Sequence, residues 1–590
     1  MKHMAADQGK VDAERQLLLD AQAKGGGAKL GAFVKLSGPG WLQSAITLGG
    51  GSLAGSLFLG ILGGTSMLWL QLVAIAMGVV MLSAISYVTL STGERPFDAI
   101  NKHINPALGW SWLIATGMAN IIWCMPQFSL CYEALDRCLL PGGLPAQAVN
   151  ADTGEVGPPT TKLGVSFAIL AATTCIVILN KQRGKAAKFF DLFLKTLVGM
   201  VVICFFGVTI YLSMQGALNW GAVFRGFVPD PGQWNNPAGS LSELMSGLSE
   251  STRTFWATRV LDQQRDVMIA AAATAVGINM TFLMPYSMLH RGWDKPFRGL
   301  ARFDLSTGMA IPYILVTSCV VIAASYAFHA KVDEQFLSSD PAVFEQSPTF
   351  KGAKDMLLVR VDEESAGKSF DEVSAEMPAV ERAALLAKMA ELPAEEKKIA
   401  SSLVKRDAFT LSKALAPLVG EKTANYIFGL GVFGMGFSTI IILMLINGFV
   451  FCEATGQSDR GPMYVAGCLV AGVAGALWPL IWDGPAKLWL AILTSSFGMM
   501  LLPIAYITFF LMMNSKSLMG DEKPTGAKML AWNGLMGISV VGAIIAAGAA
   551  IFKNAGHPTA GRVVIALGVV FVVAVIGGFL LRGKAAVEAA

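Results

Sequence analysis

Residues 38–52 read GPGWLQSAITLGGGS, and they lie inside a long apolar segment. Three consecutive glycines, Gly49 to Gly51, stand in the middle of that segment and are followed by Ser52. Each glycine disfavours a helix by about 1 kcal/mol relative to alanine, so the run predicts an unwound stretch. Unwound backbone at mid-membrane is tolerated only inside the protein or facing a cavity. We therefore expect a broken membrane helix beside a binding site.

A second interruption is predicted in the apolar segment 267–289. This segment contains Asn-Met-Thr at 279–281 and Met-Pro-Tyr at 284–286. Pro285 removes one helical hydrogen bond, and its ring clashes with the preceding turn. Broken helices at corresponding positions in two halves of a chain are typical of transporter binding sites. Freed carbonyls there favour a cation, whereas half-helix N-termini favour an anion.

The two interrupted segments belong to a strongly apolar chain. Its 590 residues are 54% hydrophobic and only 15% charged, against roughly 25% charged in soluble domains. A helix needs about 20 apolar residues to cross the hydrocarbon core. Twelve candidate spans follow from this length: 33–62, 66–89, 110–140, 163–179, 189–212, 267–289, 306–328, 426–451, 465–482, 488–513, 530–551 and 563–581. We expect an all-α polytopic membrane protein.

Lysine and arginine gather in three short loops, at 181–188, 291–302 and 516–528. Basic loops mark the cytoplasmic side, and in a twelve-span chain all three lie on the side of the N-terminus. The prediction is therefore a cytoplasmic tail over 1–32 and spans one to seven over 33–329. Spans eight to twelve and a short tail occupy 421–590. Both termini are expected in the cytoplasm of a chain placed in the cell (inner) membrane.

Residues 330–420 are predicted to form an extracytoplasmic insertion of about a small domain's length. Acidic and basic residues are mixed in it at high density. Two interpretations stay open for this segment. It forms a lid or a surface for a protein partner, or it is a solvated decoration, as mixed charge usually is.

Charged side chains inside spans usually mark a transport pathway, but spans one and six carry no acid. Neutral polar residues such as Gln43, Asn120, Gln127 and Asn279 are expected to line the centre instead. The chain contains no nucleophile–base pair, phosphate-binding loop or spaced His/Cys cluster, so neither an enzyme nor a cofactor is expected. The net charge of +4 gives no indication of nucleic-acid binding.

Several short motifs, taken in order, resemble the Nramp family of divalent-metal transporters. The Gly-Pro-Gly at 38–40 and the Gly-Gly-Gly-Ser at 49–52 stand where the family has Gly-Pro-Gly followed by Asp-Pro-Gly-Asn. The Met-Pro-Tyr at 284–286 is similar to the family's Met-Pro-His. Further matches are Leu-Ser-Thr-Gly-Glu at 90–94, Gly-Met-Gly-Phe-Ser-Thr at 434–439, Leu-Leu-Pro-Ile at 501–504 and Leu-Met-Gly at 518–520. The resemblance covers 33–520 outside the insertion and implies a LeuT-type 5+5 inverted repeat plus two additional helices.

The chain departs from the family at the metal ligands themselves. By this resemblance, Gly49 replaces the metal-binding Asp, Ser52 replaces the Asn, and Leu501 replaces the tenth-helix Gln. Met284 alone corresponds to a side-chain ligand. A methionine sulfur favours softer transition metals over magnesium and calcium, but Met284 is equally explained as an apolar gap-filler.

The residues that the family links to proton movement are also absent. Its third-helix acidic pair falls near Met125 and Phe128, and its histidine is Tyr286. We therefore expect transport without proton coupling.

Three functional classes remain. In the first, a divalent cation such as Mg²⁺ or Mn²⁺ binds at Gly49, Ser52, Thr281, Met284 and Tyr286 through carbonyls, hydroxyls and water. Magnesium suits such a site because it gives up its water reluctantly. In the second class, the substrate is a small organic solute such as an amino acid. In the third, the chain is a transport-incompetent sensor or assembly protein that works through its insertion.

Overall fold

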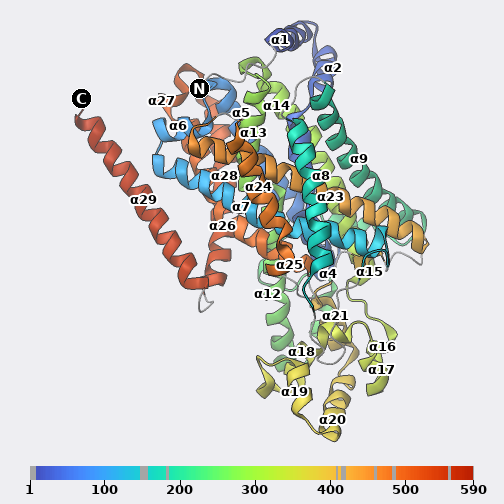
Figure 1. The fold of residues 1–590 in the computed structure, drawn as a ribbon. Coiled ribbons are helices and arrows are strands. Elements are labelled where there is room, and N and C mark those ends of the chain that lie inside the picture. The colour runs from blue at the N-terminus through green and yellow to red at the C-terminus, as the bar shows by residue number, and fades with distance from the viewer. Residues whose placement is uncertain are drawn as a thin grey trace.

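The computed structural model of the chain is a bundle of helices (Figure 1). Among the residues that it describes there is no β-strand. The described residues are 8–145, 157–180, 185–406, 409–412, 420–457, 461–481, 487–555 and 560–588.

Within these residues, nine helices are long and apolar enough to cross a membrane. One bent pair and two shorter apolar helices add to them. In chain order the elements are α3 (Pro39–Thr47) with α4 (Gly50–Gly63), α5 (Leu68–Thr92), α7 (Pro106–Ala134), α8 (Thr160–Asn180), α9 (Lys185–Met214), α12 (Glu250–Ala275) with α13 (Ile278–His290), α15 (Ile311–Phe328), α23 (Glu421–Thr455), α24 (Pro462–Ala476), α26 (Lys487–Asn514), α28 (Gly526–Ala555) and α29 (Ala560–Glu588). Each of them overlaps one of the twelve predicted spans, and the all-α polytopic architecture is confirmed.

The spans divide into inner and outer helices. In α23 and in the α12–α13 pair, 89% of the apolar window is buried, against 28% in α8, α9 and α28. Inner helices approach closely where glycine replaces a larger side chain. A methyl group on Gly475 of α24, for example, would lie 2.7 Å from the Cys124 side chain of α7. Sites carried by α12, α13 and α23 therefore lie inside the bundle.

Both predicted interruptions are present, but the second lies elsewhere than expected. In span one, α3 and α4 meet at Leu48 and Gly49 with a bend of 53°. In span six, the helix stops at Val276–Gly277, where both residues are extended. Pro285 was expected at this break, yet it lies inside the continuous helix α13.

Packing at Gly277 explains the position of the second break. A methyl group on Gly277 would lie 2.4 Å from the Trp123 ring of α7, so the indole occupies the space that any side chain would need. The glycine at the interruption is thus required by a residue far away in the sequence.

The two ends of the bundle differ (Figure 1). The helices α1 (Gln8–Ala23), α14 (Arg298–Leu305) and α27 (Lys516–Met519) lie at one end, as does the end of α29. The insertion lies at the other end. This arrangement agrees with the predicted placement of the basic loops on one side, although residues 1–7 and 181–184 lie outside the described part of the chain.

The insertion folds into short helices that pack on α12, the long first helix of span six. Its helices are α16 (Glu334–Leu337), α17 (Pro341–Glu345), α18 (Phe350–Val361), α19 (Phe370–Glu376), α20 (Ala379–Ala390) and α21 (Ala394–Leu403). The buried Glu396 pairs with Arg360 at 2.6 Å and accepts a hydrogen bond from Trp256 Nε1 of α12 at 2.8 Å. The insertion is therefore anchored directly to a broken span.

Candidate functional site

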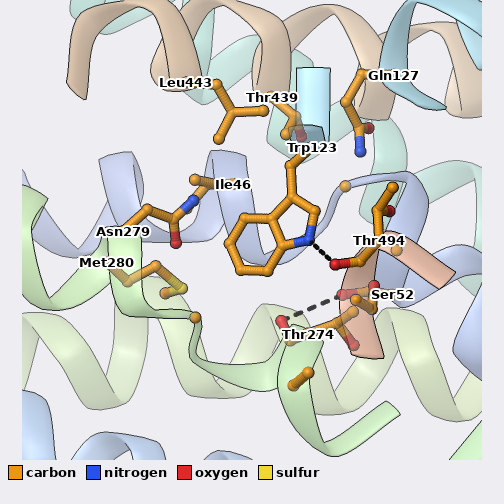
Figure 2. A pocket seen from close by; sticks show the side chains of 15 residues that line it. Ile46, Ser52, Trp123, Gln127, Thr274, Asn279, Met280, Thr439, Leu443 and Thr494 are labelled. Atoms are coloured by element: carbon orange, nitrogen blue, oxygen red, sulfur yellow. Dashed lines mark hydrogen bonds between the residues drawn. The ribbon is translucent and has the colours of Figure 1, made fainter. Parts of the chain in front are cut away.

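A cavity with a volume of about 40 Å³ lies where the two broken spans meet (Figure 2). No residue that lines it carries a formal charge. The lining residues are Ile46, Gly49, Gly51, Ser52, Trp123, Gln127, Ala273, Thr274, Gly277, Asn279, Met280, Thr439, Leu443, Thr494 and Ser495. They come from the two breaks and from α7, α23 and α26.

Side chains from neighbouring positions satisfy the backbone at the break in span one. The Gly50 amide donates to Gln127 Oε1 of α7 at 2.8 Å. The Ser52 hydroxyl donates to the Thr47 carbonyl, which the helix no longer uses. Loss of a hydrogen-bond partner in a buried site costs about 1–3 kcal/mol. The unwound stretch is therefore held as a defined structure.

Helix α23 holds the same break from the other side. The hydroxyls of Ser438 and Thr439 donate to the Ala45 carbonyl at 3.2 and 3.1 Å. A methyl group on Gly49 would lie 2.7 Å from Thr439 Oγ1, so this glycine allows the close approach. Sequence reasoning saw residues 434–439 only as a motif and did not identify this contact.

The break in span six presents free polar groups to the cavity. Asn279 is 1% exposed, and neither atom of its amide group has a hydrogen-bond partner within the described structure. The neighbouring Met280 sulfur accepts a hydrogen bond from Thr47 Oγ1 at 3.4 Å. Helix α12 also ends here, at Ala275, and Ala273 and Thr274 of its last turn line the cavity. The last carbonyls of a helix lack intrahelical partners and carry partial negative charge.

Trp123 projects from α7 into the middle of the cavity (Figure 2). Its indole Nε1 donates to the Thr494 carbonyl of α26 at 2.7 Å. The ring packs against Gly277 and Gly498, because a methyl group on either would lie within 2.4 Å of it. Trp123 was not predicted as a site residue. Its spacing from Asn120 and Gln127 places the three side chains on one face of α7. That spacing could have indicated Trp123 as a lining residue.

Of the predicted site residues, Gly49 and Ser52 line the cavity. Thr281, Met284 and Tyr286 lie along α13, outside the lining. The Thr281 hydroxyl accepts from Trp112 Nε1 at 3.0 Å and donates to the Ile278 carbonyl at 2.5 Å. Met284 is fully buried, and the Tyr286 ring stacks on Phe282 at 4.3 Å. The thioether at the cavity is Met280.

Within the described residues, no group of three or more His, Cys, Asp or Glu side chains is placed to hold a metal ion. The polar atoms that face the cavity are instead neutral hydroxyls, amides and carbonyls. Such groups favour hard cations that keep part of their water, or neutral polar molecules.

Comparison with known proteins agrees with this architecture. Residues 40–344 and 383–552 match the Nramp family, described as natural resistance-associated macrophage protein-like. A sequence search among curated proteins found no match.

Among solved structures, the chain is similar to the manganese transporter of Eremococcus coleocola. A point mutant of that protein and its complex with an aromatic bis-isothiourea compound each give a TM-score of 0.59, at 12% and 13% sequence identity. The alignments cover 94% of this chain and 94% and 95% of those chains. At such identity the likeness establishes the fold alone. Together with the family match, it shows that this chain is an integral membrane protein that belongs to the Nramp family.

Proposed function

We propose that this chain transports a divalent cation of the Mg²⁺ or Mn²⁺ kind through the cavity between its two broken spans, without proton coupling. Family membership supports metal-ion transport. The observation that carries the site assignment is the buried Asn279 amide, which lines the cavity without a hydrogen-bond partner among the described residues. Buried polar groups without partners usually mark a missing water or ion.

The size of the cavity favours a small substrate. One water molecule needs about 10–15 Å³ of such volume, so about 40 Å³ has room for roughly three. A cation with a few retained waters fits this space. An amino acid has more non-hydrogen atoms than the cavity holds in this conformation, so it enters only after the helices separate.

The charge of the site favours a cation that stays partly hydrated. No carboxylate lines the cavity, so a bare dication would lose most of its charge compensation. The C-terminal ends of α3 and α12 supply partial negative charge there, whereas the N-terminal ends of α4 and α13, which begin at the same breaks, supply partial positive charge. Retained water and the Asn279 oxygen supply the remaining stabilisation. Magnesium suits this arrangement because it dehydrates reluctantly.

The positions of two acids at the ends of the spans support transport without proton coupling. Glu453 pairs with Arg95 at 2.9 Å, and Glu133 lies 3.6 Å from Arg137. Neither acid lines the cavity. A carboxylate that stays paired with arginine outside the substrate site is poorly suited to exchange a proton for each cation.

The sidedness of the chain is part of the same proposal. We place α1, α14 and α27 in the cytoplasm of the cell (inner) membrane, since the basic loops gather at that end. The insertion then lies outside, where binding of a protein partner stays a prediction.

The function is tested by flux into proteoliposomes that contain the purified chain and a magnesium or manganese indicator. We expect flux of Mg²⁺, Mn²⁺ or both, with no change in intravesicular pH. Gly49→Trp should abolish it, because even a methyl group there meets Thr439 and Ile46. Gly534→Trp is the matched control, since nothing lies within 4 Å of that glycine on α28.

Three outcomes would overturn the proposal in different ways. Intravesicular acidification that follows cation uptake would establish proton coupling. A rise in the unfolding midpoint with amino acids, dependent on Na⁺, would favour an organic solute. Absence of flux for every divalent cation, with the protein folded and inserted, would leave the sensor or assembly function.

A further inference from the structure

An apolar cluster lies at one side of the cavity. Ile46 of α3 packs against a cluster that contains Cys124 of α7 and Leu443 of α23, and the last two are fully buried. Ile46 and Leu443 also line the cavity. We call Ile46, Cys124 and Leu443 the apolar seal.

Directly behind the seal, each of the three helices carries a carboxamide. Gln43 precedes Ile46 by three residues, Asn120 precedes Cys124 by four, and Asn447 follows Leu443 by four. Residues three or four apart stand one above the other on a helix face. We call Gln43, Asn120 and Asn447 the carboxamide layer.

The directions of the helices place all three carboxamides on the same side of the seal. Helix α3 starts beside α14, where the Gly40 amide donates to Asp304 Oδ2 at 2.6 Å, so Gln43 lies nearer to that end than Ile46 does. Helix α7 is the third span and therefore runs in the same direction as span one, and its Gln127 meets Gly50 on the other side of the seal from the α14 end.

Helix α23 runs in the opposite direction. A methyl group on its Gly436 would lie 3.0 Å from the Gln127 carbonyl of α7. Nearer the start of α7, a methyl group on Gly117 would lie 3.5 Å from Asn447 Oδ1 of α23. Asn447 therefore points towards α7, one turn from Asn120. Residues after Leu443 on α23 and residues before Cys124 on α7 thus approach the α14 end together.

These carboxamides are buried without adequate partners. Each of the three is 0% exposed. Within the described residues, both polar atoms of Gln43 and of Asn120 lack a hydrogen bond, as does Asn447 Oδ1. Only Asn447 Nδ2 is used, and it donates to the Gly467 carbonyl at 2.9 Å. Each such group costs about 1–3 kcal/mol if it stays dry, so the layer needs water or an ion.

We propose that the carboxamide layer is a second station for the partly hydrated divalent cation, between the apolar seal and the α14 end of the chain. This inference rests on the proposed function. Amide oxygens are hard, neutral ligands that accept Mg²⁺ or Mn²⁺ with its remaining water. Their lack of charge keeps binding weak, as release requires. The seal separates this station from the first one at Asn279.

Two leucine variants test the station. Gln43→Leu and Asn120→Leu remove the amides at similar side-chain volume. We expect the maximal rate of Mg²⁺ flux into proteoliposomes to fall about ten-fold or more, while the half-saturating concentration changes less than about two-fold. The thermal unfolding midpoint should stay unchanged or rise, because an unsatisfied polar group is replaced by an apolar one.

A buried glutamine with full partners is the matched control. Gln264 accepts from the Ala238 amide at 3.0 Å and donates to the Asn236 carbonyl at 3.0 Å, so Gln264→Leu should lower the unfolding midpoint. The conservative variants Gln43→Asn and Asn120→Gln should restore part of the flux.

The possible failures are distinguishable. Wild-type flux that both leucine variants retain would remove the second station and leave the proposed function intact. Flux lost together with a lowered midpoint, as in the control, would make the layer structural. A wild-type protein that is folded and moves neither Mg²⁺ nor Mn²⁺ would refute the proposed function and this station with it.

Discussion

The two broken spans are built differently. At the break in span one, neighbouring helices satisfy the polar groups: Gln127 bonds Gly50, and Ser438 and Thr439 bond the Ala45 carbonyl. At the break in span six, the indole of Trp123 occupies the space beside Gly277, and the Asn279 amide is left without a partner in the described structure. Span one is therefore a hydrogen-bonded frame, whereas span six leaves a buried polar side chain that we propose binds the cation.

This difference separates stability from transport. A group that is already hydrogen-bonded contributes to folding and has little left for a substrate. A buried group without a partner lowers stability by about 1–3 kcal/mol unless a ligand or water pairs with it. Substitutions that remove these polar groups should accordingly lower the unfolding midpoint at span one and leave it unchanged or raise it at span six.

The largest effect is expected at Gly277. Gly277→Leu places a side chain where the Trp123 ring already lies, since even a methyl group would approach it to 2.4 Å. The cavity must rearrange, so we expect cation flux to fall by about 100-fold or more. Proteoliposome flux measures this, and Gly534→Leu on the open face of α28 is the control. Flux close to wild type in Gly277→Leu would show that the indole does not fix this break.

The next effect is expected at Gln127, as a loss of stability. Gln127→Leu leaves the Gly50 amide without its acceptor in the frame, which should lower the free energy of unfolding by about 1–3 kcal/mol. The midpoint of thermal unfolding in detergent reports this loss. Gln127→Glu keeps an acceptor oxygen and should recover part of the midpoint. Equal midpoints for wild type and Gln127→Leu would contradict the role of span one as a hydrogen-bonded frame.

A smaller effect on stability is expected from pH, through a histidine that contacts the end of α4. His329 follows α15, donates through Nδ1 to the Ile61 carbonyl of α4 at 2.9 Å, and accepts from the Ser240 amide at 3.2 Å. Burial lowers the pKa of His329 below its ordinary value, so the neutral form is favoured in the folded chain.

The sign of the pH effect follows from proton binding. Below about pH 6.5 the unfolded chain binds more protons at this residue than the folded chain does. The contribution of His329 to stability is therefore lost as the pH falls through that range. Unfolding midpoints measured from pH 7.5 to 5 should decrease less steeply in His329→Gln than in wild type. Parallel decreases in the two proteins would remove His329 as the cause.

The sequence predicted the spans and the first break. Long apolar segments located the spans, and the Gly49 to Gly51 run located the first break because its signal is local. The second break was assigned near Pro285 because proline is the usual local signal. Its actual position depends on Trp123, which lies 154 residues before Gly277 and gives no signal near that glycine.

The displaced break also explains the site residues. The start of α13 sets which of its side chains face the cavity, and a start at Ile278 points Asn279 and Met280 inward. A break at Pro285 would have favoured Thr281, Met284 and Tyr286 instead. Asn279 was expected among the polar lining residues from its type alone. Met280 was not predicted, because the family motif aligns its methionine ligand with Met284.

The most direct test of the account is the concentration dependence of Mg²⁺ and Mn²⁺ flux for wild type, Asn279→Leu and Asn279→Asp in proteoliposomes. If Asn279 is the free ligand, Asn279→Leu should reduce flux about ten-fold or more with an unchanged or raised unfolding midpoint. Asn279→Asp should lower the half-saturating concentration about ten-fold, because a carboxylate compensates the charge of the dication. Equal flux curves for the three proteins, or a wild type that carries neither cation, would contradict the account.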